Sequence, residues 1–483
     1  MYLYNSATHQ KAPFVTHTPG HVEMYTCGPT VYHFAHIGNL RSYIMEDVLE
    51  KFLRYEGLDV NRVMNITDVG HLASDADTGE DKMLKGARRE HKTVMEIAKF
   101  YTDAFFEDCR KLNIKRPDVV QPATGCIDEY IAIITRLLEK GYAYQAGGNV
   151  YFDTSKLKQY YIFNDHDEED LAVGVREGVE EDLNKRNRND FVLWFTKSKF
   201  EDQALKWDSP WGVGYPGWHI ECSGISIKYN GEYLDLHCGG IDNAFPHHTN
   251  EIAQSESYLG HAWCPQWFHV HHLNTATGKM SKSKGEFLTV SLLEEKGFDP
   301  LSYRFFCLQS HYRRNLVFSW ENLQNAQAAY QKIIRRTAAL DPAKGQADEE
   351  AMTPYREQFL QQVGNDLNTS LGITALYDVL KAPLNDASKL ALLDSFDTVL
   401  GLDLTKKAAE MRKEEAEAKK NASTTDGYTV EGEGDPAVDA LVRQRAQAKK
   451  ARDFAAADRI RDELKAQGIE ITDVPGGAVW KRI

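Results

Sequence analysis

The chain has 483 residues, more than one compact core holds, with a hydrophobic fraction of 42% and a charged fraction of 27% that are ordinary for globular proteins. It has no run of eighteen apolar residues and no basic-then-apolar N-terminal pattern, so neither a membrane span nor a secretory signal is expected. Seven cysteines without a paired framework indicate reduced thiols and a cytoplasmic location.

The net charge of −14 argues against indiscriminate binding of nucleic acids, which needs positive charge. From Leu441 to Ala466, however, eight lysines and arginines stand against four acids. A basic C-terminal element on an acidic body favours selective contact with one nucleic acid. By itself, the stretch would fit a solvated helix face about as well.

Residues 1–100 predict the first half of an α/β domain. A β-type run from Val22 to Val31 precedes apolar residues at helical spacing between Leu40 and Leu53, and a strand pattern resumes from Val60 to Ile66. Strand, helix and strand in this order predict a right-handed parallel crossover and a doubly wound, Rossmann-like α/β domain.

An insertion is predicted at residues 100–205, where Gly147-Gly148 marks a hairpin. Strand patterns return at Tyr233–His237 and Gln266–Val270, so residues 205–275 form the second half of the α/β domain.

The remaining chain divides into four parts. Residues 276–320 begin with a loop rich in lysine and serine, and residues 321–404 keep helical spacing and predict a helical bundle. Residues 405–435 are rich in Lys, Glu, Ala, Gly and Thr without an apolar stripe and predict a linker. Residues 436–483 predict a small α/β module.

His36-Ile37-Gly38-Asn39 lies between the first predicted strand and helix. A helix N-terminus offers unpaired N–H groups and partial positive charge, which suit phosphate. Gly38 would let a nucleotide approach the backbone, and His36 and Asn39 can donate to phosphate oxygens. Alone, the tetrapeptide fits a capping turn better.

Lys279-Met280-Ser281-Lys282-Ser283 places two lysines beside hydroxyls on a loop. This arrangement suits a triphosphate whose charge builds as pyrophosphate leaves, although solvated basic loops are common. Together, the early His-Ile-Gly-Asn and the late Lys-Met-Ser-Lys-Ser resemble the class I aminoacyl-tRNA synthetases. That resemblance implies that both motifs bind ATP, with Lys279 and Lys282 among the catalytic residues.

Cys27, Cys222, His247 and Glu251 are a candidate zinc site. His247 and Glu251 are four residues apart after Pro246, a favoured first helical residue, and so share a helix face. Each residue also has an ordinary structural interpretation, because free cysteines are usually buried and His/Glu pairs often cap helices.

Longer motifs resemble the cysteinyl-tRNA synthetase family over nearly the whole chain. They are Cys27-Gly-Pro-Thr-Val-Tyr32, Asn65-Ile-Thr-Asp68, Trp211 to Ser223, Gly239 to Ser255, Gly364 to Thr369, Lys449 to Asp458 and Gly477 to Trp480.

The resemblance implies roles for further residues. Cys27, Thr67 and Trp218 would contact cysteine, with Thr67 near its amino group, and Gly239, Gly240 and Asp242 would hold the ATP ribose. The helical bundle would bind tRNA, and residues 276–320 would contact its stem. The anticodon residues would be Phe454, Asp458, Asp473 and Trp480, although an aromatic residue such as Phe454 in an Ala-rich helix is more often core.

The implied reaction joins L-cysteine to tRNA(Cys) through a cysteinyl adenylate, with ATP and Mg²⁺, one Zn²⁺ per chain and a monomeric enzyme. Zinc favours thiolate over hydroxyl and lowers the thiol pKa from about 8.5, so it can distinguish cysteine from serine where an apolar pocket cannot.

The chain departs from the family at three places. Asn39 stands where histidine is usual, and an apparent insertion follows Asp68 over residues 69–80. Cys238 and Thr249 replace a usual glycine and glutamate, which makes Cys238 a rival zinc ligand. Two other functions stay open: a ligase that passes the adenylate to a small amine, as in mycothiol synthesis, and a non-catalytic, zinc-stabilised RNA-binding protein.

Overall fold

The computed structural model describes residues 1–69, 83, 88, 92–163, 182–197, 205–275, 278–279, 287–423, 428–432, 434–474 and 476–482. The chain divides into two compact units, Met1–Thr405 and Lys406–Ile483. No helix in these ranges is long and apolar enough to cross a membrane.

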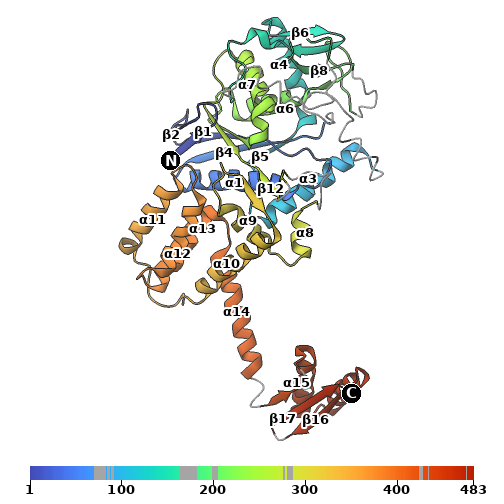
Figure 1. The fold of residues 1–483 in the computed structure, drawn as a ribbon, viewed down its shortest axis with the longest axis vertical. Helices are drawn as coiled ribbons and strands as arrows, with labels where there is room; N and C mark the ends of the chain where they lie inside the picture. The colour runs from blue at the N-terminus through green and yellow to red at the C-terminus, as the bar shows by residue number, and fades with distance from the viewer. Residues whose placement is uncertain are drawn as a thin grey trace. The chain divides into compact units, whose positions relative to one another are not determined.

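The first unit is built on a parallel five-stranded sheet, which confirms the doubly wound α/β prediction (Figure 1). Its order is β11 (Gln266–Val270), β10 (Leu236–Gly240), β3 (His21–Thr26), β4 (Asp59–Ile66) and β5 (Val119–Pro122).

The strand order reverses between β3 and β10. From β3 the chain passes through α1 (Ile37–Tyr55) to β4 on one side, whereas β10 leads through α7 (Thr249–Leu259) to β11 on the other. Because such a reversal opens a crevice at the carboxyl ends of parallel strands, this is where an α/β protein binds its ligand.

Helices cover both faces of the sheet (Figure 1). α1 and α3 (Val94–Lys111) lie on one side, and α6 (Trp218–Asn230) and α7 on the other. α1 forms because Leu40, Ile44, Val48 and Phe52 make a buried stripe, and it ends before Gly57, whose φ of 89° stops the helix.

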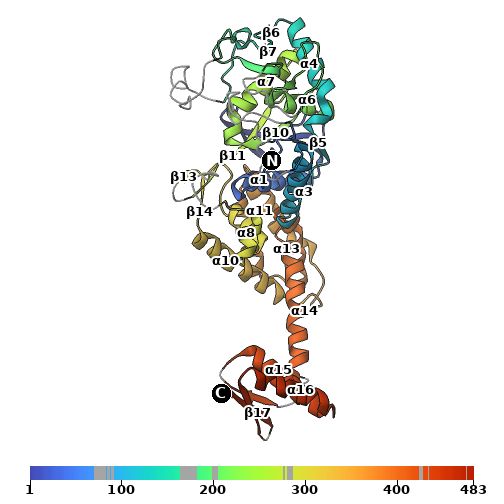
Figure 2. The same cartoon turned by 90° about the vertical axis from the view of Figure 1, so that its right-hand side faces the viewer.

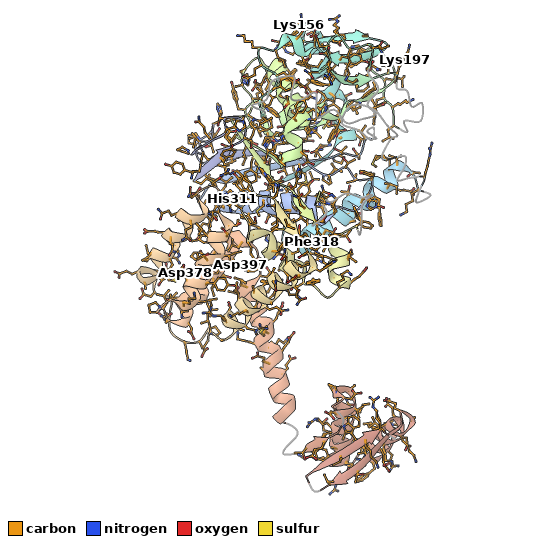
Figure 3. All side chains as sticks on the ribbon, in the orientation of Figure 1. Lys156, Lys197, His311, Phe318, Asp378 and Asp397 are labelled. Carbon is orange, nitrogen blue, oxygen red and sulfur yellow. The ribbon has the colours of Figure 1, made fainter. Side chains whose placement is uncertain are left out.

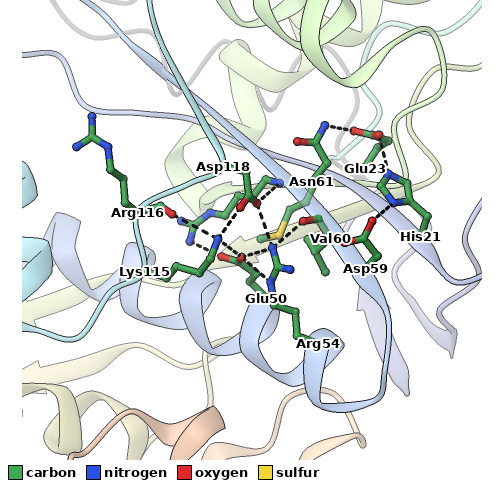
Figure 4. A network of polar contacts seen from close by, with 12 residues as sticks. His21, Glu23, Glu50, Arg54, Asp59, Val60, Asn61, Lys115, Arg116 and Asp118 are labelled. Carbon is green, nitrogen blue, oxygen red and sulfur yellow. Dashed lines mark hydrogen bonds and ion pairs between the residues drawn. The ribbon is translucent and has the colours of Figure 1, made fainter.

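The opposite, amino-terminal edge of the sheet is closed by polar contacts (Figure 4). The His21 ring lies 2.8 Å from both Glu23 and Asp59, at the starts of β3 and β4. Arg54 and Lys115 both pair with Asp118. These contacts leave the carboxyl edge as the open end of the sheet.

An antiparallel sheet of β6 (Ala143–Ala146), β7 (Asn149–Phe152), β8 (Phe191–Phe195) and β9 (Tyr215–Pro216) begins within the predicted insertion and extends past its expected end at residue 205, with α4 (Ile127–Glu139) beside it. The expected hairpin turn is present, because Gly147 and Gly148 have φ of 58° and 97°, values that favour glycine.

The part after β11 is mainly helical. Its elements are α8 (Val290–Glu295), α9 (Pro300–Leu308), α10 (Trp320–Ala338), α11 (Glu349–Val363), α12 (Thr369–Lys381) and α13 (Asp386–Leu400). A small sheet of β12 (Leu273–Thr275), β13 (Gly278–Lys279) and β14 (Leu316–Phe318) accompanies them, and β13 and β14 are labelled between β11 and α10 in Figure 2. A separate hairpin at the N-terminus consists of β1 (Tyr2–Asn5) and β2 (Gln10–Pro13).

A half-buried carboxylate fixes the end of one of these helices. Asp397, labelled with His311 and Phe318 in Figure 3, accepts from the backbone N–H groups of Leu402 and Leu404 at 2.6 and 2.7 Å. By pairing with two N–H groups past the helix end, this carboxylate stabilises the turn after α13.

Much of the predicted linker is helical. Residues Leu404–Ser423 form α14, because alanine, glutamate and lysine are strong helix formers even without an apolar stripe. Past α14, the second unit has the strands β15 (Thr429–Glu431), β16 (Ile469–Val474) and β17 (Gly477–Arg482) and the helices α15 (Pro436–Lys450) and α16 (Phe454–Ala466).

Arg304 ties the bundle to the α/β domain. Its fully buried guanidinium pairs with Asp47 at 2.7 Å and donates to the carbonyls of Leu112, Asn113 and Leu400.

Arg304→Ala is expected to lower the free energy of unfolding by about 3–5 kcal/mol, because it leaves the Asp47 carboxylate and the carbonyls buried without this partner. Chemical denaturation measures the change. Lys99→Ala, at an exposed ion pair with Asp103, is the control and should change stability by less than about 1 kcal/mol. Similar losses for the two variants would contradict this role for Arg304.

Candidate functional site

A cavity of about 320 Å³ opens at the carboxyl edge of the sheet, where the strand order reverses. It brings together most of the site residues predicted in the first unit. Those that line it are Cys27, His36, Gly38, Asn39, Thr67, Trp218, Cys222, Gly239, Gly240, Asp242 and His247.

The four predicted metal ligands cluster together, with Cys27, Cys222 and His247 lining this cavity and Glu251 fully buried beside them. Cys27 and Cys222 have their sulfurs 3.8 Å apart, and the Cys222 sulfur lies 3.4 Å from His247 Nε2. Glu251 Oε1 lies 3.1 Å from that nitrogen. Tetrahedral ligands at about 2.3 Å from zinc are about 3.8 Å from one another, so the spacing of the two sulfurs fits this metal.

Three elements supply these ligands. Cys27 follows β3, Cys222 lies on α6, and Glu251 lies in the first turn of α7. The expectation that Pro246 begins the helical turn fits the structure, because the backbone is extended at Phe245 (φ −137°, ψ 132°) and helical at His248, directly before α7. His247 and Glu251 face one another.

A second set of four groups shares two of these ligands. Cys27, His237, His248 and Glu251 also place their ligand atoms within 4.8 Å of one another. His248 and His237 do not line the cavity, however, whereas Cys222 and His247 do. A metal held by the first set therefore lies where a ligand in the cavity can reach it.

The rival ligand Cys238 belongs to neither set among the described residues. It is fully buried on β10, where it pairs with Thr26 of β3, and burial raises the pKa of its thiol well above the usual range.

The charges of the site are unusual for a buried cluster. Burial opposes the charged forms, yet Cys222 and Glu251 raise the pKa of His247 to about 10, and His237 and His247 lower the pKa of Glu251 to about 2. The raised pKa means that His247 holds a proton in the absence of a metal. Because metal binding displaces protons from its ligands, a divalent cation can replace the proton on His247.

Two further histidines support the ligands and were not predicted. His219 Nδ1 lies 2.8 Å from His247 Nδ1, so the other ring nitrogen of His247 faces the sulfurs. His237 Nε2 lies 2.8 Å from Glu251 Oε2. Such partners orient metal ligands, and the position of His219 beside Trp218 in a quoted motif was the only sequence signal for it.

The predicted phosphate site lies at the start of α1. The side chain of His36 caps this helix by accepting from the backbone N–H of Asn39 at 3.2 Å, while the Asn39 side chain is exposed. Asn39 is therefore not the structural cap, and its side-chain amide remains available to an anion at the helix N-terminus.

Gly239, Gly240 and Asp242 form the carboxyl end of β10 and the turn after it. A Cβ on Gly240 would lie 2.6 Å from the Asp242 carboxylate, and one on Gly239 would lie 2.8 Å from the His248 ring. Glycine therefore lets the exposed Asp242 carboxylate fold back beside the strand end.

The lysine loop is only partly described. Lys279 belongs to β13, which pairs with β12, whereas Lys282 and the rest of the motif from Met280 to Ser283 lie outside the described residues. The predicted insertion of residues 69–80 likewise lies outside them, except for Val69.

The predicted anticodon residues separate into two groups. Phe454 is 62% exposed on α16, where Asp458 is also exposed. Trp480 is 1% exposed in the core of the second unit and donates to Asp439, and Asp473 is paired with Arg445 and Lys449. The expectation that Phe454 is more often core does not hold here.

Two family models match the chain. The class I (C) tRNA synthetase catalytic domain matches residues 13–328, and the cysteinyl-tRNA ligase anticodon binding domain matches residues 431–480.

Curated relatives are similar over the whole length. The cysteine–tRNA ligases of Treponema denticola and Treponema pallidum are 43% and 40% identical over 100% of this chain and 99% of their own. That of Borreliella afzelii is 43% identical over 95% of each chain.

A solved methionyl-tRNA synthetase from Mycobacterium tuberculosis, in complex with methionyl-adenylate, shares the fold. Its TM-score is 0.52 at 15% identity, over 80% of this chain and 90% of that one.

Proposed function

The chain belongs to the cysteine–tRNA ligase family of class I aminoacyl-tRNA synthetases, and we propose that it activates L-cysteine with ATP and transfers it to tRNA(Cys), with zinc selecting the substrate thiol. The observation that carries this proposal is that three of the four clustered metal-ligand residues, Cys27, Cys222 and His247, line the same cavity as the ATP-motif residues His36, Asn39 and Asp242.

Cys27, Cys222, His247 and Glu251 would hold the zinc ion. Bound zinc would supply an electrophile that prefers thiolate sulfur to hydroxyl oxygen. Trp218, half-buried with its ring 4.4 Å from that of His247, would wall the pocket beside the side chain of the substrate. Serine lacks the ionisable thiol and would be rejected there.

ATP would bind across the strand ends. Gly239, Gly240 and Asp242 would hold its ribose, and the start of α1 its phosphates, with Mg²⁺ offsetting their charge. The cysteine carboxylate would then attack the α-phosphate, and His36, Asn39, Lys279 and Lys282 would stabilise the departing pyrophosphate.

The 3′-terminal ribose hydroxyl of the tRNA would attack the carbonyl carbon of the adenylate, and AMP would leave. Residues 276–320 and the helical bundle would contact the tRNA body. In the second unit, Phe454, Asp458 and Asp473 would read the anticodon. Trp480, buried in the core of this unit, would support the surface that carries them. We expect a monomer that works in the cytoplasm.

Two assays test the function. Cysteine-dependent exchange of pyrophosphate into ATP should occur without tRNA, which a non-catalytic RNA-binding protein cannot achieve. Charging of tRNA(Cys) should follow, which a ligase that acts on a small amine cannot achieve. Exchange without charging would favour the small-amine ligase.

The zinc ligands should be separable from the neighbouring thiol. The wild-type protein is expected to hold about one zinc per chain, and cysteine should add a sulfur at about 2.3 Å that serine does not, as seen by X-ray absorption. Cys222→Ser should weaken zinc retention and cysteine binding while ATP binding survives. Cys238→Ser is the matched control and should alter neither. Loss of zinc from the Cys238 variant alone would reverse the assignment.

Asn39 should act in place of the usual histidine. Asn39→Ala is expected to slow adenylation about tenfold or more, because a hydrogen bond to charged phosphate is lost. The free energy of unfolding should change by less than about 0.5 kcal/mol, since the side chain is exposed and the backbone N–H of residue 39 still donates to the capping His36 side chain. Pre-steady-state kinetics of adenylate formation measure the first effect, and thermal melting measures the second. Unchanged kinetics with a large melting shift would make Asn39 a structural residue.

Phe454 should matter for tRNA and Trp480 for folding. Phe454→Ala is expected to lower kcat/KM for charging about tenfold, because one stacked base contributes about 1–3 kcal/mol, with the melting temperature unchanged. Trp480→Ala should destabilise the second unit by about 3–5 kcal/mol, because it empties a buried site. Charging kinetics and denaturation of each variant separate these roles. A stability loss for Phe454→Ala as large as that for Trp480→Ala would contradict them.

A further inference from the structure

The hydroxyl of Thr67 lies at the end of β4, on the floor of the cavity. It follows Ile66, the last residue of the strand, and its backbone is held by the segment after Cys27. The Thr67 N–H donates to the carbonyl of Pro29 at 3.1 Å, and its carbonyl accepts from Val31 at 3.3 Å. Its position relative to the metal ligands is therefore fixed by two backbone hydrogen bonds.

The donor and the acceptor of each hydrogen bond around this hydroxyl can be assigned. The backbone N–H of Gly28 can only donate, and it contacts Asn65 Oδ1 at 2.7 Å. The amide oxygen of Asn65 is thereby assigned, and its Nδ2 group donates to Thr67 Oγ1 at 3.0 Å. Thr67 Oγ1 in turn donates to Glu221 Oε2 at 2.9 Å.

A hydroxyl has one hydrogen and two lone pairs. At Thr67 the hydrogen points to Glu221 and one lone pair accepts from Asn65. The remaining lone pair can only accept, so a ligand group that meets Thr67 in the cavity must be a donor.

The buried carboxylate that Thr67 contacts also favours a cation. The carboxylates of Glu221 and Asp68 are both buried, at 0% and 3% exposure. A donor that carries positive charge is the best match to this surface.

Glu221 and Cys222 are consecutive residues of α6. Cys222 faces the metal-ligand cluster, whereas Glu221 faces Thr67. In cysteine the thiol and the amino group are on adjacent carbons, so neighbouring residues of one helix can address both. We propose that Glu221 is a positioning residue that fixes the Thr67 hydroxyl as the acceptor for the ammonium group of the substrate. This inference rests on the proposed function, which supplies cysteine as the ligand.

The test compares L-cysteine with 3-mercaptopropionate, which keeps the thiol and carboxylate but lacks the amino group. Glu221→Gln can donate its amide hydrogen to Thr67, which frees the hydroxyl to turn. We expect the dissociation constant for cysteine to rise about tenfold or more in the zinc-loaded enzyme, because a charged hydrogen bond is lost. Values for 3-mercaptopropionate and ATP should stay within about twofold, measured by calorimetry.

Two further variants separate positioning from a general structural role. Thr67→Val should show the same selective loss, and Thr67→Ser should restore cysteine binding. The double variant Glu221→Gln/Thr67→Val should bind cysteine no more weakly than Thr67→Val alone, because Glu221 acts through Thr67. Glu256→Gln removes a carboxylate of α7 that accepts from the backbone N–H of Trp263. It is the matched control and should leave the dissociation constants for cysteine and 3-mercaptopropionate unchanged.

Equal weakening of cysteine and 3-mercaptopropionate in Glu221→Gln would overturn the inference, as would additive losses in the double variant. If Glu221→Gln does not fold, Glu221→Asp, with its shorter carboxylate, is measured against the same two ligands. Failure of the wild-type enzyme to bind 3-mercaptopropionate would instead count against the zinc–thiol account, so the two failures are distinguishable.

Discussion

At Gly28 the segment after β3 lies almost against the backbone of β4. A Cβ on this residue would be 1.6 Å from the carbonyl oxygen of Asn65, so no other residue fits without moving one strand end. The same contact sets the Gly28–Asn65 hydrogen bond and holds Cys27 beside the end of β10, whose Cys238 carbonyl accepts from the Cys27 N–H at 3.3 Å. The metal-ligand cluster, the Thr67 hydroxyl and the strand ends assigned to ATP all depend on this close approach.

The two ends of the cavity suit ligand groups of opposite charge. At the floor, two sulfurs, an imidazole and a carboxylate form a set suited to a soft, divalent cation. Toward α1, an exposed asparagine and a helix N-terminus suit an anion. On the proposed function, a small amino acid that presents its side chain to the first end and its carboxylate to the second would be oriented for adenylation. Orientation of this kind needs no covalent nucleophile from the protein.

Much of this arrangement could be predicted from the sequence, because it depends on local patterns. Apolar spacing predicted α1, β3 and β4, and the resemblance of the quoted motifs to one family predicted the residues that line the cavity. The motifs predicted the four side chains that the structure brings together as a possible metal-ligand set, and the helical turn after Phe245 directs His247 toward Glu251.

Other features could not be predicted because they depend on contacts between distant segments or on weak local preferences. The partnership of Glu221 with Thr67 joins α6 to β4, and nothing in either sequence segment indicates it. The burial of Trp480 depends on Gly432, where a Cβ would lie 2.1 Å from its ring. α14 was missed because composition typical of a linker is also composition typical of a helix.

On the proposed mechanism, a metal ion at Cys27, Cys222, His247 and Glu251 makes the distinction between cysteine and serine. The most direct measurement is the ratio of kcat/KM for cysteine- and serine-dependent pyrophosphate exchange, taken before zinc removal by a chelator, after it, and after zinc is restored. The account predicts that the preference for cysteine collapses with the metal and returns with it, because the remaining pocket offers only about 1–3 kcal/mol of discrimination between substrates of similar shape. A folded, zinc-free protein that still prefers cysteine over serine by a large factor would contradict it.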